Sequence, residues 1–310
     1  MTRPPLSGRW TAPGAALLLA LAACDAGGGA RAAKDAGAAA APDVCIIAVR
    51  AVDLPVELKE SSGIAPSRRN PGVWWSHNDS GGDAVLFAMD GAARTAGQVR
   101  VTGARNRDWE DIAVGPCAAG SCVFLGDIGN NTGRKRPLAL YRVPEPGPGD
   151  TATAPAERFE AFFPKGRPDA EALFVLPDSS VYLVTKGNTD DDPIDLYRWP
   201  TPLRAGPPVT LERVRTLAPH PEQPGDYVTG ASASPDGRWV AIRSYSTLAF
   251  FRTADLLGSG QPAVQMDLLP LAETQGEGVS LSDDGTVMLT SEGGGHHLPG
   301  TADRLACRLP

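Results

Sequence analysis

The sequence has few aromatic residues and no surplus of basic residues. Aromatic residues make up 6% of the 310 residues, and 29 lysines and arginines stand against 36 aspartates and glutamates, which gives a formal net charge of −7. A nucleic-acid-binding protein normally presents a basic face. The composition therefore argues against a nucleic acid as partner.

The sequence also lacks several short catalytic motifs. It contains no Gly-x-Ser-x-Gly nucleophile elbow, no Walker phosphate-binding loop and no dinucleotide-binding glycine fingerprint. The run Gly293-Gly294-Gly295 is not followed by a helical pattern, so it does not predict a phosphate site at a helix N-terminus. These absences leave ligand binding and metal-dependent chemistry as the function classes to consider.

The apolar run at the N-terminus is too short to be a membrane span. Residues 15–23 are all alanine or leucine, whereas a stable span needs about 20 apolar residues. With Arg3 and Arg9 before it, the run is typical of an export signal. The segment Leu21-Ala22-Ala23-Cys24 resembles a bacterial lipobox, in which Cys24 is acylated; an ordinary secretory signal with an incidental cysteine is the alternative.

The N-terminal pattern predicts where the protein resides. We expect a lipoprotein signal peptide over residues 1–23, an Ala/Gly-rich flexible tether over residues 24–43, and a folded domain over residues 44–310. The domain would then be exported and held at the bacterial cell envelope by the lipid anchor alone, in the periplasm or at the cell surface.

Glycine and proline are abundant, with 35 and 29 residues, which favours many short strands joined by turns. One short motif returns five times, each time with a carboxylate or hydroxyl residue before a small, apolar, strand-like run. The motifs are Glu60-Ser-Ser-Gly-Ile, Glu110-Asp-Ile-Ala-Val, Glu171-Ala-Leu-Phe-Val, Thr229-Gly-Ala-Ser-Ala and Glu277-Gly-Val-Ser-Leu. Their starts lie 50, 61, 58 and 48 residues apart, near the repeat of about 40–50 residues of a four-stranded propeller blade.

This repeat predicts an all-β fold, a five-bladed β-propeller, with six blades as the alternative. Each motif would open the innermost strand of a blade. Four blades have four strand-like segments each, but the last has only three before the chain stops. The segment 45–60 resembles the missing outer strand, and pairing it with the last blade would remove an exposed sheet edge.

The cysteines fit this closure. Export places Cys45, Cys117, Cys122 and Cys307 in an oxidising compartment. Cys117 and Cys122 flank a short turn between two strands, which predicts a local disulfide. Antiparallel pairing of the N-terminal strand with the last strand brings Cys45 next to Cys307, which predicts the second disulfide.

Strand direction places all five motif residues on one face of the propeller, around its axis. A ring of carboxylates repels itself unless it binds protons, cations or a metal. A hard cation suits such oxygen ligands, and Ca²⁺ is the expected cofactor. The predicted ligands are Glu60, Glu110, Glu171, Thr229 and Glu277. In the alternative interpretation these glutamates accept backbone N–H bonds and no metal binds.

Loops between second and third strands reach the same face and supply candidate ligand-binding residues. Lys186 and Arg243 would accept an anionic group such as phosphate or carboxylate, or else form salt bridges with neighbouring acids. His77 and His296 are candidate acid–base groups, with solvated loop histidines as the alternative. The full predicted set is His77, Asn78, Asp79, Asp127, Asn130, Asn131, Lys186, Arg243, Tyr245, Glu292 and His296.

Several of these segments together resemble a group of exported bacterial propeller proteins related to the esterase-like phytase propellers. The segments are Glu60-Ser-Ser-Gly-Ile, His77-Asn-Asp-Ser-Gly, Asp108-Trp-Glu-Asp-Ile-Ala, Gly126-Asp-Ile-Gly-Asn-Asn, Thr229-Gly-Ala-Ser-Ala and Glu277-Gly-Val. The resemblance covers most of residues 58–295 and implies the fold more strongly than an activity. The layout of oxygen ligands around an axis is also similar to that of the calcium-activated nucleotidase (apyrase) propellers.

Two functions fit the sequence. The first is a membrane-tethered, monomeric propeller with an axial calcium site that binds a small anionic ligand or a protein partner without turnover. The second is a calcium-dependent phosphoester hydrolase, phytase-like or nucleotidase-like, in which the metal polarises a phosphoryl oxygen. The sequence offers no nucleophile or base that would favour the second, and a propeller fold does not imply a function.

Overall fold

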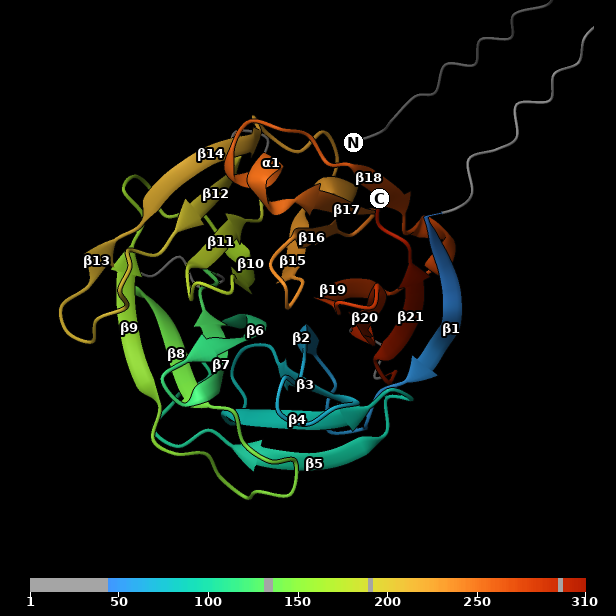
Figure 1. Ribbon diagram of the computed structural model, residues 1–310, viewed down its shortest axis with the longest axis horizontal. Coiled ribbons are helices and arrows are strands. Elements are labelled where there is room, and N and C mark those ends of the chain that lie inside the picture. The colour runs from blue at the N-terminus through green and yellow to red at the C-terminus, as the bar shows by residue number, and fades with distance from the viewer. Residues whose placement is uncertain (1–43, 131–135, 189–191, 295–297) are drawn as a thin grey trace, which may run out of the picture. The chain divides into compact units, whose positions relative to one another are not determined.

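The computed structural model describes residues 44–130, 136–188, 192–294 and 298–310. These residues form five small β-sheets around a central axis (Figure 1), so the predicted five-bladed propeller is confirmed. No described helix is long and apolar enough to cross a membrane. The predicted signal peptide, the lipidation site Cys24 and the tether over residues 24–43 lie outside the described residues.

The blades follow the chain in order, and within each blade the strands run from the axis outward. Blade one contains β2 (Ser61–Pro66), β3 (Val73–Asn78), β4 (Val85–Asp90) and β5 (Thr95–Arg100). Blade two contains β6 (Trp109–Cys117), β7 (Gly120–Asp127), β8 (Leu138–Pro144), β9 (Glu157–Phe162) and a short parallel strand, β13 (Val209–Thr210). Blade three contains β10 (Ala170–Val175), β11 (Val181–Thr185), β12 (Ile194–Arg198) and β14 (Glu212–Ala218).

The last two blades complete the ring. Blade four contains β15 (Val228–Ala233), β16 (Trp239–Ser244), β17 (Thr247–Arg252) and β18 (Val264–Asp267), with the one-turn helix α1 (Thr253–Leu257) after β17. Blade five contains β19 (Gln275–Leu281), β20 (Thr286–Glu292), β21 (Thr301–Cys307) and, outermost, β1 (Cys45–Asp53). Two short 3₁₀ turns, Pro224–Asp226 and Leu269–Leu271, precede β15 and β19.

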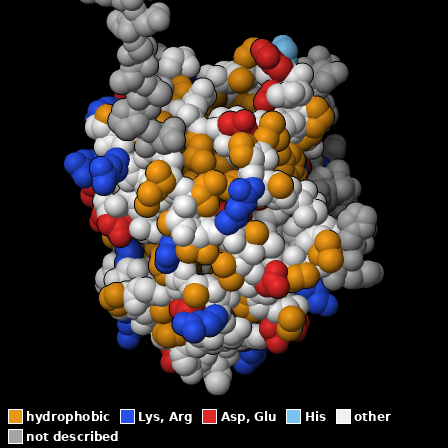
Figure 2. Space-filling view, turned by 90° about the vertical axis from the view of Figure 1, so that its right-hand side faces the viewer, with side chains coloured by type: hydrophobic (Ala, Val, Ile, Leu, Met, Phe, Trp, Pro, Cys, Tyr) orange, Lys and Arg blue, Asp and Glu red, His pale blue; other side chains and the backbone are white. Residues whose placement is uncertain are grey.

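The N-terminal strand β1 closes the propeller as predicted. It pairs antiparallel with β21, with Cys45 opposite Cys307 in the register, and these two cysteines form a disulfide. The second disulfide, Cys117–Cys122, spans the turn between β6 and β7. As the outermost strand, β1 exposes apolar side chains such as Ile46, and hydrophobic side chains are visible on this side of the molecule (Figure 2).

The hydrophobic core consists of separate layers between neighbouring blades. Trp75 and Trp109 pack in the layer between blades one and two. Phe124 and Leu173 pack between blades two and three, and Phe174 and Val240 pack between blades three and four. Because each layer needs side chains from two blades, no blade can bury its apolar faces alone.

Near the axis the inner strands approach one another too closely for large side chains. A Cβ atom on Gly230 of β15 would lie 2.6 Å from the carbonyl oxygen of Glu277 on β19. A Cβ atom on Gly63 of β2 would lie 2.7 Å from Oδ1 of Asp111 on β6. Glycine in a strand interior is expected where another backbone approaches closely, and here it allows five strands to meet around one axis.

Candidate metal centre at the axial mouth

Each innermost strand carries a β-bulge at the same place. In β6, Trp109 pairs with Asp127 and Asp111 with Gly126, so Glu110 is the extra residue. The extra residues in the other strands are Ser62 in β2, Glu171 in β10, Thr229 in β15 and the pair Glu277–Gly278 in β19. A bulge leaves its extra residue out of the ladder and re-aims the side chain. Five bulges at one level thus define a ring of side chains at one end of the axis, which we call the axial mouth.

The bulge positions show that the first motif was aligned with the others at the wrong residue. The bulged residue of blade one is Ser62, whereas Glu60 lies two residues earlier, before β2 begins, and its side chain is exposed. Strand pairing decides the position, because Ser61 faces Asn78 and Gly63 faces His77 across the ladder. Glu60 was aligned with the other glutamates because it is acidic. The β-bulge, which repeats in every blade, places Ser62 at the equivalent position instead.

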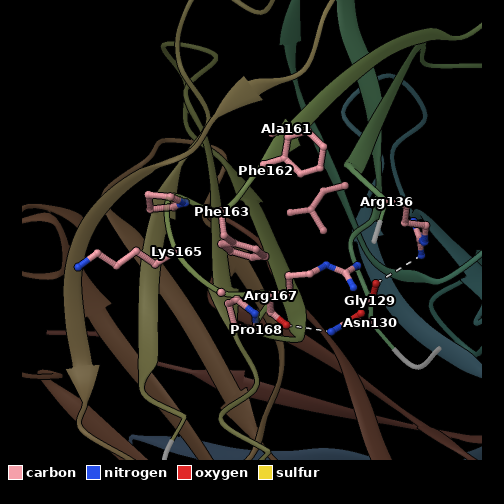
Figure 3. A pocket seen from close by; sticks show the side chains of 12 residues that line it. Gly129, Asn130, Arg136, Ala161, Phe162, Phe163, Lys165, Arg167 and Pro168 are labelled. Atoms are coloured by element: carbon pink, nitrogen blue, oxygen red, sulfur yellow. Dashed lines mark hydrogen bonds between the residues drawn. The ribbon is translucent and has the colours of Figure 1, made fainter. Parts of the chain in front are cut away.

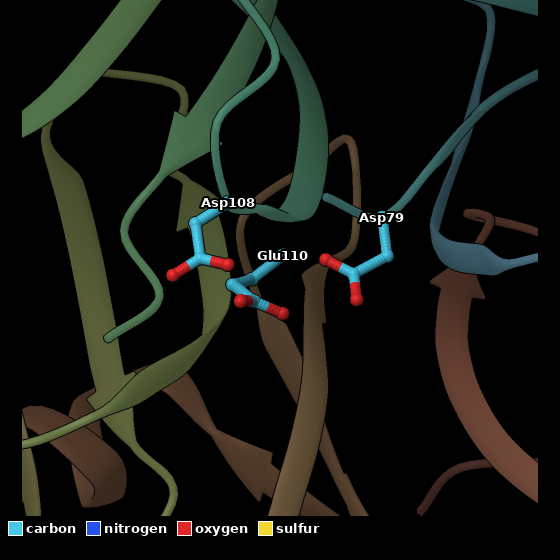
Figure 4. A group of neighbouring side chains, drawn as sticks. All are labelled: Asp79, Asp108 and Glu110. Carbon is cyan, nitrogen blue, oxygen red and sulfur yellow. The ribbon is translucent and has the colours of Figure 1, made fainter. Parts of the chain in front are cut away.

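Two groups of three carboxylates meet at Glu110. One consists of Asp79, Asp108 and Glu110, and the other of Glu110, Asp169 and Glu171. Within each group one ligand oxygen from every residue lies within 4.8 Å of the others. Figure 4 shows the Glu110 carboxylate between those of Asp79 and Asp108.

The shared residue, Glu110, has one carboxylate oxygen that the described part of the chain leaves unpaired. Glu110 is buried, yet its Oε1 has no hydrogen-bond partner among the described residues, and the same holds for Oδ1 of Asp79. A buried acceptor left unsatisfied costs about 1–3 kcal/mol, and more if it is charged. A Cβ atom on Gly129 would lie 1.8 Å from Glu110 Oε1, so only glycine fits beside this carboxylate.

Burial and mutual repulsion raise the pKa values of the mouth carboxylates. Burial, with some repulsion from Asp108 and Glu60, raises the pKa of Asp79 to about 6. Burial also raises the pKa of Glu171 to about 8, although Lys186 opposes this, and it raises that of Glu110 well above the ordinary range, helped by Glu171. Without a counter-ion the mouth therefore holds protons near neutral pH.

Two cationic side chains border the carboxylates. Lys186 Nζ lies 2.8 Å from Oε1 of Glu171, and Arg136 bridges Asp127 at 3.0 Å and Asp108 at 3.4 Å. Burial lowers the pKa of Lys186, but the nearby Glu171 outweighs it and the net shift is upward, so the ammonium stays charged. These cations offset part of the negative charge of the mouth.

Arg243 does not serve the mouth as predicted. It is completely buried, its Nη2 lies 2.7 Å from Oε2 of Glu273, and its Nη1 donates to the carbonyl oxygen of Gly278. A buried arginine with an acid and a carbonyl as partners holds strands together, so the salt-bridge alternative describes this residue.

Blades four and five add polar groups on the far side of the mouth. The Tyr245 hydroxyl and the Gln275 amide both donate to Oε1 of Glu277, at 3.2 and 2.9 Å. Burial raises the pKa of Glu277 to about 7 and that of Glu292 to about 7. The Thr229 hydroxyl donates to the carbonyl oxygens of Gly276 and Glu277, so it ties β15 to β19.

The predicted loop residues have different roles. His77 packs edge-on against Trp109 in the layer between blades one and two, and burial lowers its pKa to about 4, so it is neutral at pH 7. The Asn78 side chain bonds to backbone atoms of Glu60 and Glu57 and shapes the loop. Asn130 donates its backbone N–H to Asp169 at 2.7 Å. Asn131 and His296 lie outside the described residues.

Asp108 and Asp169 are site residues that the sequence motifs did not predict. Both are buried at the mouth, and both stand two residues before a bulged glutamate, in Asp108-Trp109-Glu110 and Asp169-Ala170-Glu171. This repeated Asp-x-Glu spacing in two consecutive blades was a usable signal. With Asp79, Glu110 and Glu171 these residues make up the two carboxylate groups that share Glu110, and oxygen donors are what hard divalent cations prefer.

Comparisons with known proteins find distant structural similarities. The chain matches no protein-family model, and no curated protein is significantly similar to it in sequence. Among solved structures, the PQQ-bound aldose sugar dehydrogenase from Streptomyces coelicolor is 12% identical with a TM-score of 0.49, covering 86% of this chain and 99% of that one. A gluconolactonase from Xanthomonas campestris is 13% identical with a TM-score of 0.46, covering 80% of this chain and 72% of that one.

A streptogramin B lyase is 10% identical with a TM-score of 0.40, covering 84% of this chain and 97% of that one. These three neighbours are β-propeller enzymes. At such low identity, and with TM-scores below 0.5, the likeness carries no argument about this chain. The link to phytase-like or apyrase-like propellers stays a prediction from the motifs.

Proposed function

We propose that the protein is an exported β-propeller that binds Ca²⁺ at its axial mouth and uses the bound ion to hold a small anionic ligand. One observation carries the proposal: Glu110 is buried at the centre of two carboxylate groups, with an oxygen that has no partner among the described residues. The two disulfides suit an oxidising compartment outside the cytoplasm, where free Ca²⁺ is plentiful.

The donor chemistry favours Ca²⁺ over other metals. The two groups at Glu110 offer carboxylate oxygens from Asp79, Asp108, Asp169 and Glu171 besides Glu110 itself. Ca²⁺ accepts six to eight oxygen ligands in flexible geometry, whereas Mg²⁺ demands a near-ideal octahedron and Zn²⁺ prefers nitrogen and sulfur. The ion would also supply the positive charge that these buried carboxylates need in order to ionise.

The surroundings of the ion favour an anion as the next ligand. Lys186 and Arg136 lie on the blade-two and blade-three side of the mouth, each already paired with a carboxylate. A phosphate or carboxylate group that completes the coordination of the cation would come within reach of these charges. A small organic anion therefore suits the mouth better than a neutral or cationic ligand.

A calcium-dependent phosphoester hydrolase is the second candidate. The observation that favours it is Lys186, whose charged amine lies 2.8 Å from a carboxylate of the metal centre. A metal that polarises a phosphoryl oxygen, with an ammonium group beside it, is an arrangement able to stabilise the charge of a phosphoryl-transfer transition state. We rank binding first because the motifs supply no nucleophile or base.

The test of the calcium site combines metal analysis with thermal unfolding. Purified protein should contain Ca²⁺, and Ca²⁺ at about 100 times its Kd should stabilise the fold by about 2.7 kcal/mol, which raises Tm by about 5 °C. Glu110→Gln should abolish this shift without lowering the Tm of the metal-free protein, because the raised pKa of Glu110 keeps this side chain neutral there and glutamine is a neutral side chain of the same shape. Glu222→Gln, at an exposed glutamate, is the matched control and should keep the full shift.

The absence of bound metal and of any Ca²⁺-dependent Tm shift in the unaltered protein would contradict the proposal. Assays with nucleoside diphosphates, phytate and simple phosphoesters separate the two candidates. Ca²⁺-dependent turnover that is lost in Glu110→Gln and reduced at least about 100-fold in Lys186→Ala would establish the hydrolase instead.

A further inference from the structure

A cavity of about 350 Å³, beside the metal centre, is lined by blade two and by the segment that connects blade two to blade three. Phe162, Phe163 and Leu138 form its apolar part, and Arg136 and Arg167 contribute cationic side chains (Figure 3). Lys165 is also part of the lining, but Figure 3 shows its amine directed away from the other side chains. The cavity therefore combines two aromatic rings with positive charge.

The wall that the cavity shares with the metal centre is one stretch of backbone, Gly129–Asn130. On one side of this stretch, a Cβ atom on Gly129 would lie 1.8 Å from Oε1 of Glu110 and 2.8 Å from Cγ of Asp108. The Asn130 N–H donates to Asp169, whereas the Asn130 side chain donates to the carbonyl oxygen of Arg167 in the cavity lining. Only one stretch of polypeptide backbone therefore separates a ligand group at the mouth from the cavity.

Arg136 connects the two places electrostatically. Arg136 lines the cavity, and its guanidinium pairs with Asp127 and Asp108 at the mouth. An anion bound at the metal centre beside Gly129 would therefore lie close to Arg136. The organic part of the same molecule would then point toward Phe162 and Phe163.

The apolar lining is unusual for a surface of this protein. Phe162 ends β9 and keeps 47% of its surface exposed, among only six large hydrophobic residues of the described chain that are so exposed. Small-molecule sites are concave, mostly apolar and carry a few polar groups that fix orientation. Aromatic rings beside guanidinium groups favour flat π-systems over aliphatic chains.

We propose that this cavity holds the aromatic body of the anionic ligand whose charged group binds the metal ion at the mouth. The inference rests on the proposed function and narrows its ligand to small aromatic anions, such as aryl phosphates, aryl phosphonates or aryl carboxylates. Phe162 and Phe163 contact the ring, and Arg136 lies next to the charged group.

Two phosphonates test this inference, because their carbon–phosphorus bond resists hydrolysis. Methylphosphonate carries the charged group alone, and 1-naphthylphosphonate adds an aromatic body. Isothermal titration calorimetry on the unaltered protein with saturating Ca²⁺ should show that the naphthyl compound binds at least about tenfold more tightly. Both compounds should lose binding in metal-free protein.

Phe162→Ala is the diagnostic variant, since its exposed ring can be removed without opening the core. It should reduce the advantage of the naphthyl compound about tenfold and leave methylphosphonate binding unchanged. Val56→Ala is the matched control. Val56 is 73% exposed and lines a different pocket, of about 520 Å³, beside Glu60 and Glu292. Its variant should bind both compounds like the unaltered protein.

The outcomes separate the two proposals. Equal affinities for the two phosphonates would overturn the aromatic subsite while leaving the metal centre in place. Loss of the naphthyl advantage in Val56→Ala, and not in Phe162→Ala, would place the ring in the other pocket and also overturn it. Binding of neither compound in the presence of Ca²⁺ would contradict both this inference and the anion-binding function.

Discussion

Asp111 joins three blades through one buried carboxylate. Its Oδ1 accepts the N–H of Ile112 at 2.8 Å, and its Oδ2 accepts the N–H groups of Leu173 and Ala231 at 2.7 and 3.1 Å. These donors belong to β6, β10 and β15, the inner strands of blades two, three and four. The neighbouring residue Glu110 belongs to the carboxylate groups of the axial mouth, so these two adjacent carboxylates have different roles.

Asp111→Ala should destabilise the protein strongly. The substitution leaves three backbone N–H groups without their acceptor, and each buried donor left unsatisfied costs about 1–3 kcal/mol. We expect urea unfolding to show a loss of about 3 kcal/mol or more, while the Ca²⁺-induced shift in Tm persists. Asp83→Ala, at an exposed loop residue, serves as the control. A loss below about 1 kcal/mol would show that the axis does not depend on this carboxylate.

At the scale of elements, the innermost strands form the mouth, whereas the closing strand β1 joins the ends of the domain. The bulges of β2, β6, β10, β15 and β19 create the mouth by turning one side chain per blade out of the ladder. The strand β1 contributes nothing to the mouth, but it pairs with β21 and so joins the two ends of the domain. A propeller without this closure would leave β21 as an unpaired edge.

Removal of the closing disulfide should cost more stability than removal of the local one. The cysteines of the pair Cys45–Cys307 are 262 residues apart, and those of Cys117–Cys122 are 5 apart. In the chain-entropy model the longer loop contributes about 5 kcal/mol and the shorter about 2 kcal/mol. Double serine variants of each pair, compared by urea unfolding, check this order. Equal losses would mean that strain or residual structure outweighs loop entropy.

At the scale of the whole molecule, the proposed Ca²⁺ site would couple metal binding to the stability of the fold. Burial raises the pKa of Asp79 to about 6, of Glu277 and Glu292 to about 7 and of Glu171 to about 8. In the unfolded chain these groups have ordinary carboxyl pKa values of about 4. Between about pH 4 and about pH 8 the metal-free folded protein binds more protons than the unfolded chain, so rising pH favours unfolding.

The stability of the metal-free protein should therefore fall as pH rises from about 4 to about 8. With saturating Ca²⁺ the carboxylates ionise in the folded state, and the slope should flatten or reverse. Thermal unfolding of metal-free and Ca²⁺-loaded protein across this range measures both curves, and calorimetry at about pH 6.5 in two buffers of different ionisation enthalpy should detect proton release on binding. Parallel curves for the two forms would contradict the coupling.

Much of the fold was predictable from the sequence, because it depends on local patterns that repeat. The five motif starts gave the blade count, and the three strand-like segments after Glu277 showed that one outer strand had to come from elsewhere. The disulfide between Cys45 and Cys307 then followed from the antiparallel pairing of the first and last strands. Glu110, Glu171 and Glu277 were predicted at the axis from the same repeat, and they occupy bulge positions at one level in blades two, three and five.

Only the tertiary structure decided which of these residues share a site. The bulge in β2 moved the equivalent position from Glu60 to Ser62, and a bulge depends on pairing across the ladder, which residue types alone do not reveal. Lys186 directly follows β11 and Arg243 lies near the end of β16, the second strands of blades three and four. Arg243 nevertheless meets Glu273 in the interior, whereas Lys186 meets Glu171 at the mouth. The sequence by itself determined the number and order of the blades, because both follow from the periodicity of the motifs. The packing of the blades around the axis decided where the charged side chains meet, because their distances depend on strands that are far apart in the chain.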